Sequence, residues 1–177
     1  MKFQDMPYTD RYAQVMDIMT SRGLLLGAYD KDGKPNAMTI GWGSIGSIWG
    51  MPVWIVLVRP SRYTYGCIEH SDCFSVCVPG RDLATACAIC GSKSGRDSDK
   101  LATAGLTAQP GSIVHASIIS HCPIVYECQV MHRNDIIPSE LVKQLQEGPY
   151  ASGDYHRLYY GAIVAARVAD DVAQRLG

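Results

Sequence analysis

Residues 36–46 read Asn-Ala-Met-Thr-Ile-Gly-Trp-Gly-Ser-Ile-Gly, an apolar run follows at 51–58, and residues 59–65 read Arg-Pro-Ser-Arg-Tyr-Thr-Tyr. The first segment offers small residues, backbone donors and a tryptophan, while the last offers arginines, hydroxyl groups and tyrosines. A slot lined by backbone groups suits a flat ring, and guanidinium groups suit a phosphate because they bind it with two parallel hydrogen bonds. These segments therefore predict a site for one flat ligand that carries a phosphate group.

Length and composition indicate a single domain over residues 1–177. Of the 177 residues 47% are hydrophobic, which is enough for a sizeable core. The formal net charge is -1 and the isoelectric point is near 6.5, so no strong field points to nucleic acid or to a charged membrane surface as a partner. Small molecules are the expected ligands.

The sequence carries no signal for export or membrane insertion. No run reaches the ~18 apolar residues that a membrane span needs, and the N-terminal Met-Lys-Phe-Gln-Asp lacks the apolar segment of a signal peptide. We therefore expect a cytoplasmic protein. Its seven cysteines then predict reduced, buried side chains and no disulfide framework.

The first part of the chain predicts a helix followed by a β-hairpin. Apolar residues recur every three to four positions between residues 10 and 20, which favours a short amphipathic helix. The apolar run 24–29 and the segment 35–42 flank Asp32-Gly33, a strong tight-turn signal. We expect these two segments to pair as antiparallel strands.

Three glycines, Gly41, Gly43 and Gly46, surround Trp42. Glycine weakens a strand interior, so this pattern suggests a bulge or a place where a ligand approaches the backbone closely. The following segment 52–58, Pro-Val-Trp-Ile-Val-Leu-Val, shows no polar alternation. It predicts a strand buried on both faces.

The rest of the chain predicts short helices between strands. Ser61 suits the N-cap of a helix over 61–70, and Asp82 suits that of a helix over 82–90, which Gly91 ends. Further elements are expected as strands at 74–78, 113–119, 123–132 and 155–168, and as short helices up to residue 104 and over 138–146. This pattern indicates a mainly β protein with short helices, built as a β-barrel.

Arg59, Ser61, Arg62 and Thr64 form the strongest candidate site. They lie where a strand is expected to run into a helix, and helix N-termini present free N–H groups and a partial positive charge. The junction therefore suits a phosphate. The alternative is a pair of solvated arginines beside a capped helix, since short clusters of this kind are common.

Other candidates flank this junction. The polar stretch 92–100 ends in Lys100, whose charge would stabilise a ring that becomes anionic on reduction, or it is simply a solvated loop. Trp42 could form a wall of the ring slot or belong to the core. His156 is of a type that donates a proton near neutral pH, or it is only hydrogen-bonded at a strand start.

Cys87-x-x-Cys90 raises a rival hypothesis, a redox pair or half of a zinc site. Zinc usually needs a second such pair, and Cys122-x5-Cys128 does not supply one, so no metal is expected. The spacing of the other histidines builds no site. The sequence also lacks a phosphate-binding loop of the Gly-Lys-Ser/Thr kind and a Gly-x-Ser-x-Gly elbow.

Taken together and in order, the motifs resemble the flavin reductase-like family with the FMN-binding split-barrel fold, and within it the flavoredoxin-like branch. The resemblance spans roughly residues 24–168. The motifs that carry it are Gly33–Thr39, Trp42, the strand 52–58, the segments 59–64, 74–79 and 90–100, and Gly153-Asp-Tyr-His156.

The resemblance implies a split β-barrel that binds FMN noncovalently at the interface of a homodimer. It implies ring contacts from residue 36 and the 38–43 backbone, and phosphate and ribityl contacts from the 59–64 segment. The cofactor-binding residues carried over are Asn36, Met38, Thr39, Ile40, Gly41, Trp42, Gly43, Arg59, Ser61, Arg62, Tyr63, Thr64, Cys90, Gly91, Ser92, Ser94, Gly95 and Lys100. His156 matches a histidine near the flavin, and the resemblance leaves its role open.

The activity that the resemblance implies is that of an FMN-dependent oxidoreductase. Electrons would pass from NADH, NADPH or another donor through FMN to a small acceptor. An alternative is an FMN electron carrier that acts with a redox partner protein. The cysteine pair, as a redox or metal site, ranks third.

Overall fold

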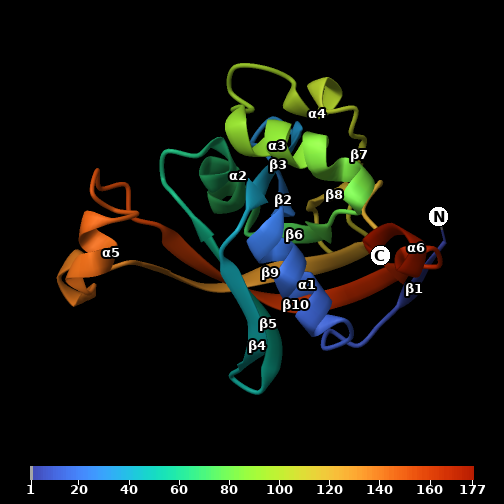
Figure 1. The fold of residues 1–177 in the computed structure, drawn as a ribbon, viewed down its shortest axis with the longest axis horizontal. Coiled ribbons are helices and arrows are strands. Elements are labelled where there is room, and N and C mark those ends of the chain that lie inside the picture. The colour runs from blue at the N-terminus through green and yellow to red at the C-terminus, as the bar shows by residue number, and fades with distance from the viewer. Residues whose placement is uncertain (1) are drawn as a thin grey trace.

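The computed structural model describes residues 2–177 and is mainly β, as the sequence predicts (Figure 1). Its strands are β1 (Phe3–Asp5), β2 (Leu24–Tyr29), β3 (Pro35–Ile40), β4 (Gly43–Ile48), β5 (Met51–Val58), β6 (Cys73–Val78), β7 (Ala108–Pro110), β8 (Ser117–Ile119), β9 (Ile124–Asp135) and β10 (Arg157–Ala169). Its helices are α1 (Tyr12–Ser21), α2 (Tyr63–Ser71), α3 (Ala84–Ser92), α4 (Lys100–Thr103), α5 (Lys143–Glu147) and α6 (Val172–Leu176), with 3-10 turns η1 (Arg81–Leu83) and η2 (Pro138–Glu140).

One antiparallel sheet forms the body of the protein. Its strands follow the order β3-β2-β6-β9-β10-β5-β4, and β1 pairs with β10. The edge strands β3 and β4 are consecutive in sequence, yet no ladder joins them in the described chain. The sheet is therefore a barrel that stays open along one seam.

β2 and β3 form the predicted hairpin and pair along their whole length. The carboxylate of Asp30 closes the turn, since its Oδ1 accepts hydrogen bonds from the backbone N–H groups of Asp32 (2.9 Å) and Lys34 (2.8 Å). β3 ends at Ile40, two residues before the expected end, because the next two residues cross the seam to β4.

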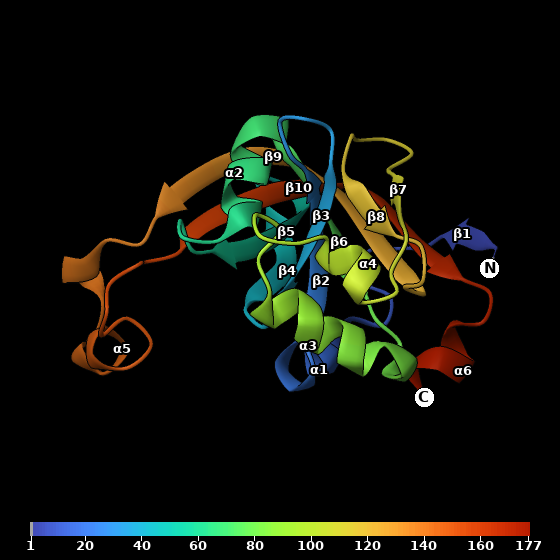
Figure 2. The same cartoon turned by 90° about the horizontal axis from the view of Figure 1, so that it is seen from above.

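Two apolar clusters stabilise the sheet. The main cluster lies between the sheet and helices α1, α2 and α6, and its largest fully buried side chains include Trp54, Phe74, Tyr126 and Tyr159. The second lies under α3, which crosses β2 and β3 (Figure 2), and it contains Cys77, Cys87, Cys90 and Cys122. No helix within residues 2–177 is long and apolar enough to cross a membrane.

β5 departs from the prediction of a strand buried on both faces. Ile55 and Leu57 are only partly buried, whereas Trp54 and Val56 are fully buried. No helix of the described chain covers the outer face, so its apolar residues remain partly open to solvent.

Helices α2 and α3 begin differently from the prediction. The N-cap of α2 is Arg62, not Ser61, and no side chain caps the helix. Asp82 lies in η1 before α3 and pairs with Arg175 (2.8 Å) instead of capping α3. Gly91 lies inside α3, which ends one residue later.

The strand expected over 113–119 is present only as β8, and the prediction is wrong for its first part. The fully buried carboxylate of Glu127 accepts hydrogen bonds from the backbone N–H groups of residues 112–114 at 2.8–3.1 Å and binds Arg167. These N–H groups cannot also form the hydrogen bonds of a β-ladder, so the segment wraps around the carboxylate of Glu127. Burial raises the pKa of Glu127, but the hydrogen bonds outweigh it and hold the pKa below its ordinary value.

The sequence does not predict β1, β4, β7 and α6. β1 and β7 are three residues each, too short to show a period. β4 contains Gly43 and Gly46, which the sequence indicates as a bulge, but β5 pairs with it along its length. α6 is a single short turn near the C-terminus.

β9 and β10 extend beyond the body and carry an arm, residues 136–156, that projects from the molecule (Figure 1). The helix expected over 138–146 appears there as two pieces, η2 and α5. Three apolar side chains of the arm are exposed: Ile137 by 61%, Val142 by 64% and Leu145 by 41%. Such surface on a projecting segment is typical of contact with another chain.

Candidate functional site

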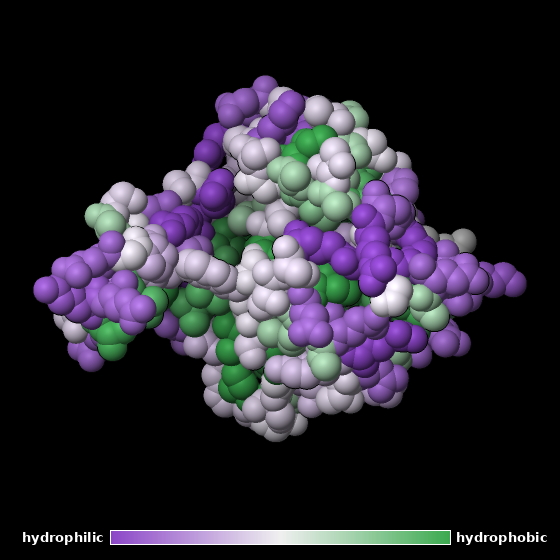
Figure 3. All heavy atoms as spheres, viewed as in Figure 1, coloured by the Kyte–Doolittle hydropathy of each residue, from purple (hydrophilic) through white to green (hydrophobic). Residues whose placement is uncertain are grey.

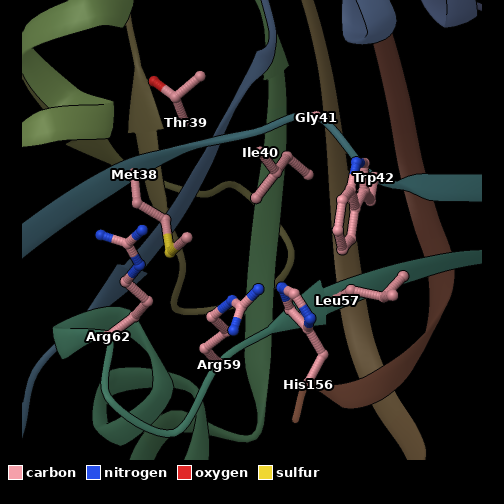
Figure 4. A pocket seen from close by; sticks show the side chains of 9 residues that line it. All are labelled: Met38, Thr39, Ile40, Gly41, Trp42, Leu57, Arg59, Arg62 and His156. Carbon is pink, nitrogen blue, oxygen red and sulfur yellow. The ribbon is translucent and has the colours of Figure 1, made fainter. Parts of the chain in front are cut away.

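A cavity of about 220 Å³ lies at the open seam, between β3 and the start of β10 (Figure 4). We call it the seam cavity. Its walls come from edge strand β3, the two residues that follow it, the end of β5, the start of α2 and the base of the arm. They are formed by Met38, Thr39, Ile40, Gly41, Trp42, Leu57, Arg59, Arg62 and His156.

β3 presents much of its backbone to the seam cavity. The side chain of Thr39 points away from the cavity, and its hydroxyl donates a hydrogen bond to the carbonyl of Cys87 in α3 (2.6 Å; Figure 4). Gly41 adds no side chain, and β3 is an edge strand, so its outer N–H and C=O groups face no neighbouring strand. The wall therefore offers backbone donors and acceptors to a flat ring.

Trp42 closes one end of the seam cavity. Its side chain is 46% exposed, and its ring centroid lies 5.1 Å from that of His156 and 6.4 Å from that of Tyr150. The structure thus favours the interpretation of Trp42 as a cavity wall over that of a core residue.

Arg59 fastens the arm to the end of β5. Its guanidinium donates hydrogen bonds to the carbonyls of Pro149 (2.7 Å) and Asp154 (3.0 Å) and lies over the ring of Tyr150, 5.2 Å from its centroid. The sequence predicts Arg59 at a phosphate, whereas the structure places it in the seam cavity. The base of the arm thereby becomes part of the cavity wall.

His156 is nearly buried, with 9% of its surface exposed, and its Nδ1 lies 2.7 Å from the hydroxyl of Tyr150. Burial first, and then the positive charge of Arg59, lowers the pKa of His156 to about 4. The imidazole is therefore neutral at pH 7. His156 therefore lines the cavity and contacts the Tyr150 hydroxyl as a neutral ring.

A second cavity of about 130 Å³ adjoins the first, and the two share Met38 and Arg62. We call it the basic cavity. Its walls carry Arg62, Lys93, Arg96 and Lys100 and contain no carboxylate. The other wall residues are Ser61, Tyr63, Thr64, Cys90, Gly91, Ser92 and Ser94.

Lys100 is a buried cation without a carboxylate partner among residues 2–177. It is 4% exposed, and its Nζ donates hydrogen bonds to the carbonyls of Cys90 and Lys93, both at 3.3 Å. Burial lowers the pKa of Lys100 because the charged form loses solvation. One N–H of the ammonium group is left for an anion in the cavity.

Arg62 and Thr64 also direct free donors to the basic cavity. In the part of the chain that the structure describes, the Arg62 side chain forms neither a hydrogen bond nor an ion pair. Thr64 is buried, and its Oγ1 accepts a hydrogen bond from Nδ2 of Asn36 (2.7 Å), so its own hydrogen is available to another acceptor. The uncapped first turn of α2 adds backbone N–H groups. These donors suit a phosphate.

Ser61 and Tyr63 line the basic cavity but already have partners. The Ser61 hydroxyl donates to the carboxylate of Asp154 (2.6 Å), which also accepts from the Ser61 backbone N–H (3.2 Å). The Tyr63 hydroxyl donates to Asp30 (2.7 Å), and this bond, with burial, raises the pKa of Tyr63 to about 12. The hydroxyl hydrogens of both residues are therefore already engaged by neighbouring carboxylates.

The structure gathers most of the predicted site residues around these two cavities. Gly43 lines neither, because it packs against β5, where an added Cβ would lie 2.7 Å from the carbonyl oxygen of Ile55. Asn36 and Gly95 lie in a narrow passage beyond the basic cavity.

Three wall residues are missed by the sequence analysis: Leu57, Lys93 and Arg96. The sequence contains a feature that could have identified each of these three residues. Lys93 and Arg96 belong to the polar stretch 92–100, and Leu57 lies two residues before Arg59, on the same face of an extended strand.

The geometry does not support the rival hypothesis of a Cys87/Cys90 redox or zinc site. Both thiols are buried in α3, and burial raises the pKa of Cys87 to about 11 and also raises that of Cys90. Protonated, buried thiols are poor nucleophiles. No group of three or more His, Cys, Asp or Glu side chains within residues 2–177 could hold a metal ion.

Comparison with known proteins establishes the class. Residues 16–176 match the family described as flavin reductase like domain, and the chain belongs to this family. This confirms the resemblance seen in the motifs. No curated protein matches the chain significantly.

Solved structures show the same fold. The flavoredoxin of Desulfovibrio vulgaris (Miyazaki F) has a TM-score of 0.69 at 27% identity, over 84% of this chain and 70% of that chain. The flavoredoxin of Methanosarcina acetivorans has a TM-score of 0.68 at 26% identity, over 85% and 70%. An FMN-binding domain of a flavin reductase-like enzyme from Shewanella baltica OS155 has a TM-score of 0.68 at 16% identity, over 97% and 79%. The open-seamed sheet is therefore the predicted split barrel.

The groove formed by the two cavities fits FMN. The basic cavity offers the unpaired guanidinium of Arg62 and the buried ammonium of Lys100 to a phosphate, with no carboxylate to repel it. The seam cavity offers a wall of backbone along β3 and one exposed aromatic side chain to a flat ring.

We expect the imidazole of His156 to stay neutral down to about pH 5 in the folded protein, as followed by NMR. The unfolded chain would bind this proton near pH 6.5 and the folded chain only near pH 4. The unfolding free energy should therefore fall as the pH is lowered from 6.5 to 4, by on the order of 2 kcal/mol. The His156→Gln variant should lose this part of the pH dependence. A folded-state midpoint near 6.5 would contradict the buried, neutral assignment.

Proposed function

We propose that the protein is an FMN-dependent oxidoreductase that passes electrons from NADH, NADPH or another donor through noncovalently bound FMN to a small acceptor. One observation carries this proposal. A cavity with Arg62, Lys93, Arg96 and Lys100 and no carboxylate opens, through shared walls, into a cavity bounded by edge strand β3 and Trp42. This pairing suits a phosphate joined to a flat ring.

The chain would bind and orient the cofactor, and FMN supplies the redox chemistry when bound. Arg62, Lys100 and the first turn of α2 would hold the phosphate. The backbone of residues 38–42 would hold the ring. Trp42 and the neutral His156 line the open side of the seam cavity, where an electron donor or acceptor would approach the flavin ring. This function does not require a charged side chain as acid or base.

A second candidate is an FMN electron carrier that exchanges electrons with a redox partner protein. The likeness to two flavoredoxins, at 27% and 26% identity, favours it. Both functions need the same groove, and they differ in whether a nicotinamide donor reduces the flavin directly.

We predict that Arg62→Ala weakens FMN binding roughly ten- to a hundredfold, because it removes charged hydrogen bonds to the phosphate. Riboflavin has the ring and ribityl chain but no phosphate, so it should bind equally well to both proteins. Isothermal titration calorimetry measures both affinities. Arg62 has no hydrogen-bond partner within residues 2–177, so the fold should be unaffected.

The matched control is Arg81→Ala, an exposed arginine outside both cavities, which should leave FMN binding unchanged. An equal loss of riboflavin binding in Arg62→Ala would place Arg62 at the ring. Unchanged FMN affinity would refute the phosphate assignment.

We also predict that NADH or NADPH, added without oxygen to the FMN-loaded protein, bleaches the visible flavin absorption. Direct reduction is expected because the seam cavity is open beside Trp42, where a nicotinamide can reach the ring. Absorption that persists with both donors but is lost with dithionite would favour the carrier. Failure to take up FMN would refute both functions.

We further propose that the protein is a homodimer. The uncovered sheet face carries Ile55 and Tyr160 opposite each other, and Trp49, which is 59% exposed, packs beside Tyr160 (5.9 Å) and His132 (6.0 Å). Apolar surface also lies on the arm and in the hollow between the arm and the body (Figure 3). A two-fold dimer would bury such surface on both copies at once.

Analytical ultracentrifugation tests the dimer. The unaltered chain should sediment as a dimer, and Tyr160→Arg should shift it toward monomer by placing a charge in the interface. Tyr12→Arg, at an aromatic residue of α1 that is 43% exposed, should have no such effect. A monomeric unaltered chain would refute this proposal.

A further inference from the structure

The arm joins the body through a neck that one ion pair closes. Asp135 is the last residue of β9 and Arg157 the first of β10, and the two are partners in the ladder between these strands. The guanidinium of Arg157 binds both carboxylate oxygens of Asp135, through Nε to Oδ1 (2.7 Å) and through Nη2 to Oδ2 (2.8 Å). The whole arm lies between the two members of this pair (Figure 1).

Glu69 of α2 docks the neck on the body. Its carboxylate accepts hydrogen bonds from Nη1 of Arg157 (3.1 Å) and from the hydroxyl of Tyr159 (2.8 Å). The guanidinium of Arg157 also lies over the ring of Tyr65, 5.3 Å from its centroid. Arg157 therefore ties the neck to α2, the helix whose first turn lines the basic cavity.

The geometry of this network sets it apart from an ordinary surface ion pair. An isolated pair of exposed charges adds little to stability, because solvent screens it and both side chains lose freedom. Arg157 instead binds one carboxylate with two parallel hydrogen bonds and a second carboxylate with a third, and only 22% of its side chain is exposed. Such a network holds two strands and a helix in one arrangement.

His156 directly precedes Arg157 and lines the seam cavity (Figure 4). Its backbone carbonyl accepts a hydrogen bond from the N–H of Ile136 (3.2 Å), which continues the pairing of the neck by one step into the arm. The position of the imidazole in the cavity wall thus depends on how the neck is held.

The other attachment of the arm lies on the opposite side of His156 in the sequence. Arg59 binds the carbonyls of Pro149 and Asp154, and Ser61 binds the carboxylate of Asp154. His156 therefore stands between two attachments, this one and the neck. If the neck were released, the imidazole would be held from one side only.

We propose that Arg157 is a positioning residue that holds His156 in the wall of the seam cavity. It acts by joining the neck, through Asp135, to Glu69 of α2. Arg157 lines neither the seam cavity nor the basic cavity, so its effect on a ligand there passes through His156. The inference rests on the proposed function where it concerns the flavin ring, whereas the placement of His156 can be measured without flavin.

NMR of the full, flavin-free chain tests the placement of His156. Arg157→Ala should release the neck and let water reach the imidazole, so the pKa of His156 should rise from about 4 toward 6.5. Arg133→Ala is the matched control and should leave this pKa at about 4. Arg133 belongs to the same network, but its contacts are with Glu69, Asp72 and the ring of Tyr159, all outside the arm.

Isothermal titration calorimetry tests the effect on the flavin ring. Arg157→Ala should weaken FMN and riboflavin by the same factor, roughly three- to tenfold, because the ring loses part of its wall while the phosphate donors stay in place. Arg62→Ala, by contrast, is expected to weaken FMN alone. Arg133→Ala should leave both affinities unchanged.

Asp135→Asn provides a second variant that keeps the shape of the side chain and removes only its charge. It should raise the pKa of His156 in the same direction as Arg157→Ala, by less. A pKa that stays near 4 in both variants would overturn the proposal, and so would an equal rise in Arg133→Ala. Failure of both flavins to bind the unaltered chain would refute the proposed function, while the NMR measurement would still decide the role of Arg157.

Discussion

The unpaired seam between β3 and β4 is the constraint on which the rest of the molecule depends. These strands follow each other in sequence but stand at opposite ends of the sheet order, so the two residues between them must cross the gap. The outer edge of β3 is left without a strand partner, and an edge of free N–H and C=O groups must be covered or used. In this fold it becomes a wall of the seam cavity.

A single buried hydrogen bond sets the width of the adjoining groove. Nδ2 of Asn36 in β3 donates to Oγ1 of Thr64 in α2 over 2.7 Å, and both side chains are almost fully buried. Two segments that lie apart in the sequence thus face the same space at a fixed separation. The base of the arm, held by Arg59, supplies the remaining side. The site is therefore assembled from edge strand β3, the start of α2, the loop between α3 and α4, and the base of the arm.

The sequence predicts those features that depend on neighbouring residues. The hairpin β2–β3, the run that forms β5, the junction with Arg62 and Thr64 and, separately, Lys100 in the polar stretch 92–100 could all be found from local pattern. Features that depend on distant contacts could not. β4 needs its partner β5 to offset its glycines, and Ser61 is engaged by Asp154, 93 residues away. The low pKa of His156 arises only once the base of the arm packs beside Arg59 at the end of β5, which no local pattern reveals.

Burial shields the cysteine thiols of this chain from solvent. All seven thiols are buried, and burial raises the pKa of Cys67 and Cys87 to about 11. Peroxides and alkylating agents react with the thiolate, and such thiols form almost none at neutral pH. A flavoprotein that works in air is exposed to peroxide from its own turnover. In this chain the side chains of all seven cysteines are buried, which limits the access of such an oxidant to the thiols.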